Sequence, residues 1–182
     1  MTYYGGKELA AAFRTVRANT IKIANEIPEE QYDFKASPDV RSVREMLTHI
    51  ALGSIFPRQV HQNKVDDMKT FNFQDLMATM TAEQAKVRSR AEIIELLRTD
   101  GESFAAYLEG LSDAFLAETV TMMPGAQPAT KSRFEMLLGA KEHEMHHRGQ
   151  LMLMERMIGI VPHLTRDFQE RVARMQAAQA AR

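Results

Sequence analysis

The feature that most constrains this fold is residues 132–158, a long stretch without proline that has a helical pattern of apolar residues. Ser132 followed by Glu135 fits a capping box, in which the two side chains bond to the backbone at the start of a helix. One arc of the helical wheel is apolar and holds Met136, Ala140, Leu151, Met154 and Ile158. A helix with one apolar side buries that side against other elements, so this stretch predicts a helix packed in a larger core.

Similar patterns recur along the chain and predict further helices near residues 5–26, from residue 40 to Pro57, at 89–111 and at 166–181. Pro57 is expected to kink or end the second of these near Gly53. Residues 64–89 predict irregular structure with a short helical turn near 73–80, and residues 119–130 predict turns with a short extended piece. The predicted fold class is all-α, a four-helix bundle with crossover loops and an additional C-terminal helix. The predicted domains are a bundle at residues 1–165 and a helical extension at residues 166–182.

Residues 143–150 read HEMHHRGQ, and they place His143 and His147 one helical turn apart inside the apolar arc. Two imidazoles that converge on a buried face predict a metal site, because unpaired polar groups are costly in a core. The alternative is a pair of histidines that are hydrogen-bonded for structural reasons alone. A tight site needs a third ligand, for which His49 is the candidate, on the flank of the second helix's apolar stripe. Glu45, one turn earlier, is its expected supporting partner or a rival ligand.

The other histidines and Glu144 are expected to lie at the surface. His61 and His163 are predicted to be surface residues, and His146 is expected to face solvent or to support a ligand. His143, Glu144 and His147 also fit the H-E-x-x-H pattern of zinc proteases, in which the glutamate activates water. That pattern is usually accompanied by a sheet that binds extended peptide, and no sheet is predicted upstream. Glu144 is therefore predicted to be a surface charge, as are Lys141, Arg148, Glu155 and Arg156.

Composition excludes several classes of function. The chain of 182 residues has no cysteine, which removes disulfides, thiolate metal sites and cysteine nucleophiles. Its formal net charge of -1, with no block of lysine and arginine, gives no electrostatic indication of a nucleic-acid partner. No apolar run approaches the length of a membrane span, and the N-terminal residues lack the apolar core of a signal peptide. The expected location is the cytoplasm.

The segments SVREMLTHIA and SRFEMLLGAKEHEMHHRGQLMLMERMIGI, with a proline soon after the second, resemble the DinB family over residues 5–165. The preceding loop, IPEEQYDFKASPDVRSVRE, resembles the segment that leads into the family's second helix. The resemblance implies a four-helix bundle in which three side chains hold a divalent metal, at the positions of His49, His143 and His147. In related thiol-dependent transferases the position of His143 can be glutamate, and the position of Glu144 is not a catalytic group of the family.

The resemblance implies a metal-dependent enzyme, either a thiol-dependent S-transferase or a hydrolase of a small substrate. The expected cofactor is a divalent metal ion, with zinc or nickel ahead of manganese. The expected partners are a small-molecule substrate, a low-molecular-weight thiol and a second copy of the chain in a homodimer. No nucleic acid and no membrane are expected as partners. The alternative function is a non-enzymatic, stress-related protein that binds a metal or a small ligand.

Overall fold

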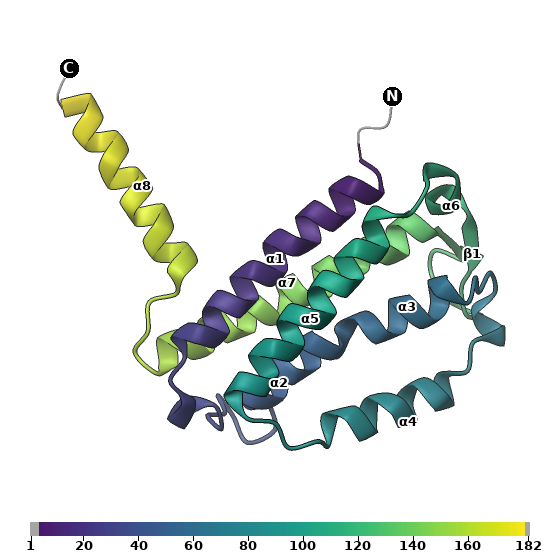
Figure 1. The fold of residues 1–182 in the computed structure, drawn as a ribbon, viewed down its shortest axis with the longest axis horizontal. Helices are drawn as coiled ribbons and strands as arrows, with labels where there is room; N and C mark the ends of the chain where they lie inside the picture. Colours follow the sequence, from purple (N-terminus) through teal and green to yellow (C-terminus); the bar gives the residue numbers. More distant parts are fainter. Residues whose placement is uncertain (1–3, 181–182) are drawn as a thin grey trace.

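The protein is a bundle of long helices that lie side by side (Figure 1). We describe it from a computed structural model, which describes residues 4–180. The bundle consists of α1 (Gly6–Glu26), the consecutive helices α2 (Val43–Ala51) and α3 (Ile55–Gln62), α5 (Arg90–Glu109) and α7 (Arg133–Met157). Both α1 and α2 pack against α5 and α7. The predicted all-α four-helix bundle is therefore confirmed.

Shorter elements surround the bundle. They are α4 (Phe73–Gln84), α6 (Asp113–Ala117), α8 (His163–Ala180), the 3-10 turns η1 (Glu29–Gln31), η2 (Leu52–Ser54) and η3 (Met68–Thr70), and the antiparallel strands β1 (Thr119–Thr121) and β2 (Thr130–Ser132). The strands are the predicted extended piece. Helix α4 is longer than the short helical turn expected there, because the Asn72 side chain accepts a hydrogen bond from the backbone of Asp75 and starts a full helix.

Local signals in the sequence set the ends of the bundle helices. Capping boxes begin α5 at Ser89 and α7 at Ser132, as predicted, and a third begins α2 at Ser42. The break expected near Gly53 is also present, since η2 separates α2 from α3. Pro57 does not end the helical segment, because α3 begins at Ile55. It lies in the first turn of α3, where proline is tolerated.

A small apolar cluster joins α3 to η3 and β1, and two larger ones fill the rest of the described bundle with a polar layer between them. One cluster joins the second half of α1 to α2 and to one end of α5 and α7, and the other joins the first half of α1 to the opposite ends. Arg17 in the middle of α1 and Glu144 in the middle of α7 occupy the layer, with 4% and 2% of their surfaces exposed. Gly101 in α5 makes room for this arginine, because a Cβ atom there would lie 2.7 Å from Arg17 Cγ.

The corner where α8 leaves the bundle buries two residues that were predicted to be at the surface. Glu155 of α7 is fully buried and His163, the first residue of α8, is 1% exposed, so both predictions were wrong. His163 Nε2 lies 3.1 Å from Asn19 Oδ1 of α1, and Arg166 pairs with Glu26 of α1 at 2.7 Å. The bundle therefore holds α8 by its first turn, which starts three residues before the predicted extension.

The burial of Glu155 is expected to make the stability of the fold depend on pH. The pKa of its carboxyl is raised from 4.5 to about 7, mainly by burial and also by the nearby Glu26 carboxylate, against the smaller lowering effects of Arg166 and Arg156. Because this pKa is higher in the folded state, the stabilisation is complete below pH 4.5 and is lost as pH rises through 7. We expect Glu155→Gln to gain stability relative to the wild type between pH 5 and 8, by at most about 1.4 kcal/mol per pH unit.

Urea denaturation followed by circular dichroism at several pH values measures this difference. Glu142→Gln is the matched control, since Glu142 is an exposed carboxylate on the same helix. If the free energy of unfolding of the two variants depends on pH in the same way, the pKa of Glu155 is not raised by burial and this prediction is wrong.

Most of α8 projects away from the bundle (Figure 1). Phe168 and Met175, predicted to lie on its apolar side with Val172, are 61% and 57% exposed and so do not cover the bundle. The homodimer stays a prediction, with this side of α8 as the surface that a second copy would cover; a monomer in light scattering would contradict it.

The domain division also stays a prediction, and residues 181–182 of the extension lie outside the described part. Among the described helices, none is long and apolar enough to span a membrane.

Candidate metal centre

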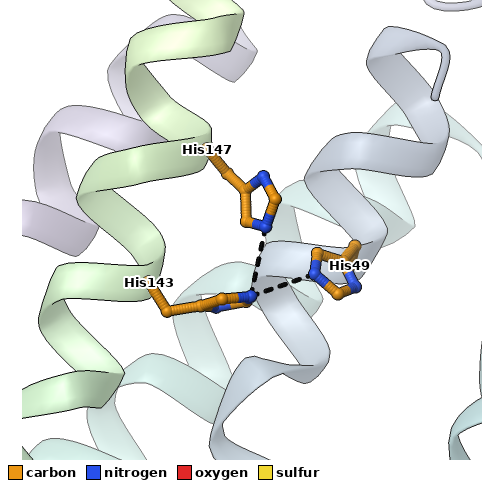
Figure 2. Close-up of side chains that lie close together, drawn as sticks. All are labelled: His49, His143 and His147. Atoms are coloured by element: carbon orange, nitrogen blue, oxygen red, sulfur yellow. Dashed lines mark hydrogen bonds between the residues drawn. The ribbon is translucent and has the colours of Figure 1, made fainter. Parts of the chain in front are cut away.

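The three predicted histidines meet between α2 and α7 (Figure 2). His143 Nε2 lies 3.1 Å from His49 Nε2 and 3.1 Å from His147 Nε2. His147 is buried, whereas His49 and His143 are half-buried. One ring nitrogen from each histidine lies within 4.8 Å of those of the other two, and no other group of three metal-ligating residues within residues 4–180 does so.

These distances fit a shared metal ion better than hydrogen bonds between the rings. Nitrogens bound to one zinc ion at about 2.0–2.1 Å in tetrahedral geometry are roughly 3.3 Å apart, close to the separations found here. The two contacts cannot both be hydrogen bonds. The proton of His147 is on Nδ1, so a hydrogen bond between His147 and His143 needs a proton on His143 Nε2. That single N–H points at His147 and cannot also join His143 to His49.

Gln150 selects the tautomer of His147. Its Oε1 lies 2.8 Å from His147 Nδ1, and an amide oxygen only accepts, so Nδ1 carries the proton and the lone pair of Nε2 faces the other histidines. A hydrogen bond to the far nitrogen of a metal-binding histidine is typical of such sites. By contrast, the buried Nδ1 of His49 has no hydrogen-bond partner among the described residues.

The surroundings keep all three imidazoles neutral, which is the form that binds metal. The pKa of His49 is lowered to about 4, mainly by burial and also by the positive charge of Arg41. Burial is also the largest cause that lowers the pKa of His143 and His147, while Gln150 partly opposes it at His147. The residues present therefore fit a divalent ion, although metal binding by them stays a prediction.

Glu144 is not the surface charge that was predicted. Its carboxylate accepts hydrogen bonds from Arg17 Nε at 3.0 Å and from Thr20 Oγ1 at 2.7 Å, on the side of α7 that faces α1. The same guanidinium donates to the Leu97 carbonyl at 2.8 Å. Glu144 is thus fully engaged away from the histidines, and it does not occupy the place of the water-activating glutamate of a zinc protease.

The remaining candidates have other partners. Glu45 is exposed, accepts from the Ser42 backbone at 2.7 Å and pairs with Lys35 at 3.2 Å, so it is not brought to the histidines. His61 was predicted at the surface but is 1% exposed, because α3 packs it against Arg133, whose Nη1 lies 3.3 Å from His61 Nδ1. His146 is exposed, as expected.

A cavity of about 860 Å³ opens beside His147, the member of the three-histidine cluster that lines it. Its lining includes His147 and Gln150 of α7, Thr48 of α2, Gln84 at the end of α4, and the segment 35–41 with Arg41. Arg41 was not among the functional residues predicted from the sequence. The available signal was its position directly before Ser42, the cap of the helix that carries His49.

The chain matches the DinB superfamily over residues 12–151, a range that includes the three histidines. The chain belongs to the DinB superfamily. The predicted resemblance is confirmed. No curated protein matches this DinB-superfamily chain in sequence.

Solved structures share the DinB fold at low sequence identity. A DinB-like protein from Bacillus subtilis has 21% identity and a TM-score of 0.60, covering 84% of this chain and 92% of its own. YfiT from Bacillus subtilis, described as a probable metal-dependent hydrolase with an unusual four-helix bundle topology, has 13% identity and a TM-score of 0.65, covering 88% and 91%. An uncharacterised protein from Clostridium difficile 630 has 14% identity and a TM-score of 0.64, covering 87% and 99%. At these identities the likeness concerns the fold alone.

Proposed function

We propose that this protein is a divalent-metal-dependent enzyme that acts on a small molecule bound in the cavity beside the histidines. The observation that carries the proposal is the convergence of three neutral imidazole nitrogens, 3.1 Å apart in two pairs, one of which, on His147, belongs to a residue that lines a cavity of about 860 Å³. Three protein ligands leave coordination positions open, which is typical of catalytic rather than structural sites.

Each residue has a defined task in this proposal. His49, His143 and His147 hold the ion, and Gln150 keeps the Nε2 of His147 unprotonated. A bound divalent ion would act as a Lewis acid and lower the pKa of a coordinated water or thiol. The chain has no cysteine, so a thiol would come from solution as a cosubstrate.

Two chemistries are consistent with this site, hydrolysis and conjugation of a low-molecular-weight thiol to an electrophile. The description of YfiT as a probable metal-dependent hydrolase supports the first. Imidazole ligands accept zinc, nickel and manganese, so the donor set alone does not choose among them.

Elemental analysis of the purified protein, followed by activity assays on the metal-loaded form, tests the proposal. We expect close to one divalent ion per chain, and turnover that stops on chelation and returns when metal is added. Activity against ester or amide substrates without thiol would identify a hydrolase, and turnover of an electrophile only with added thiol would identify a transferase. Bound metal without turnover in either assay would favour the non-enzymatic alternative, and absence of binding to any of the three metals would refute the metal site.

A further inference from the structure

The cavity beside the histidines has four charged side chains in its lining, and they are not equivalent. Lys35 and Glu45 form an ion pair at 3.2 Å, and Glu45 also accepts a hydrogen bond from the Ser42 backbone. Asp39 is exposed and accepts a hydrogen bond from the Ser37 hydroxyl at 2.6 Å. Arg41 differs, because its guanidinium has no ion pair or hydrogen bond among the described residues.

Arg41 lies beside the candidate metal centre. It lines the same cavity as His147 and Gln150, so a molecule in the cavity can reach both the guanidinium and His147.

None of the three candidate ligands is a carboxylate, and of the two carboxylates in the cavity lining Glu45 is paired with Lys35, whereas Asp39 is bonded to the Ser37 hydroxyl. The three histidine ligands are neutral, and Glu144, the carboxylate next to His143 in the sequence, is bonded to Arg17 on the other side of α7. A divalent ion held by neutral ligands beside a free guanidinium creates a positive potential, which attracts anions and repels cations. The planar guanidinium is suited to bind a carboxylate or phosphate through two parallel hydrogen bonds.

We propose that the cavity selects small oxyanionic substrates and that Arg41 binds their carboxylate or phosphate group. This inference rests on the proposed function, because it assumes that the other end of the substrate reacts at the metal ion. The binding of an anion by Arg41, however, does not require the metal. Arg41 is therefore a residue that determines substrate specificity, while the histidines hold the ion.

The test is calorimetric titration of malonate and of inorganic phosphate into metal-free and zinc-loaded protein. Malonamide, the neutral amide analogue of malonate, controls for shape. We expect at least one of the two anions to bind the wild type more tightly than malonamide does, and more weakly at high salt. Arg41→Ala is expected to raise the Kd of that anion by about ten-fold or more, the effect of losing a charge-assisted hydrogen bond. Arg41→Lys should retain part of the affinity.

Arg171→Ala is the matched control, since Arg171 is an exposed arginine on α8. It is expected to bind anions like the wild type. Equal anion affinity of Arg41→Ala and Arg171→Ala would overturn the proposal, and so would failure of both anions to bind the wild type. Zinc affinity is measured separately on the same variants, so loss of zinc binding with intact anion binding would refute the proposed function and leave the role of Arg41 standing.

Discussion

Glu144→Gln is expected to lower the free energy of unfolding by about 3–5 kcal/mol. The substitution keeps the shape of the side chain but removes the charge that faces the Arg17 guanidinium, and both side chains are at least 95% buried. Removing one partner of a buried ion pair leaves an uncompensated charge in the core, which costs more than the pair itself contributes. Urea denaturation followed by circular dichroism measures the change.

Two further variants separate charge from other effects. Glu142→Gln removes an exposed carboxylate from the same helix and should change stability by less than about 0.5 kcal/mol. The double variant Arg17→Met with Glu144→Leu removes both charges and should recover much of the loss, because apolar replacements of buried ion pairs are often tolerated. If Glu144→Gln is as stable as Glu142→Gln, the ion pair is not formed as described.

Glu144→Gln also tests the protease interpretation. The carboxylate faces α1 rather than the histidines, so the metal content of the folded variant should equal that of the wild type. A folded variant that kept its metal and lost all activity would restore the mechanism in which Glu144 activates water.

His49→Ala is expected to lower the affinity for a divalent ion about ten-fold or more, comparably to His147→Ala. His143 and His147 come from one helix and supply one side of a coordination sphere. His49 is the only ligand contributed by α2, and its Nε2 lies 3.1 Å from His143 Nε2 across the helix interface. Competition with a chelator of known affinity, using zinc, measures the loss.

His146→Ala is the matched control for this prediction. His146 lies on the same helix between two of the predicted ligands, but it is exposed and its nearest polar partner is Gln150 Nε2 at 3.4 Å. We expect its zinc affinity to stay within about two-fold of the wild type. Equal losses for His146→Ala and His49→Ala would show that the three-histidine ligand set is wrong.

The sequence by itself determined the long helices of the bundle and the three histidines of the candidate site, but not the full length of α4 or the presence of α6. Serine and glutamate three residues apart act through local hydrogen bonds, so the starts of α5 and α7 could be located without tertiary information. His143 and His147 could be paired because helical geometry alone places residues i and i+4 on one face. His49 could be joined to them because it lies on the flank of an apolar stripe, and such stripes face the core.

The tertiary structure decided which polar residues are buried and what they contact. Helix α7 packs against α1 as well as α2, so its buried surface is wider than its apolar arc. On the side facing α1, Glu144 and Glu155 look like surface charges in the sequence, and Arg17 lies more than 100 residues before the carboxylate it pairs with. Arg41 likewise becomes a candidate only when the 35–41 segment is brought beside His147. Burial of a charge depends on a partner from a distant segment, and no local pattern in the sequence specifies that partner.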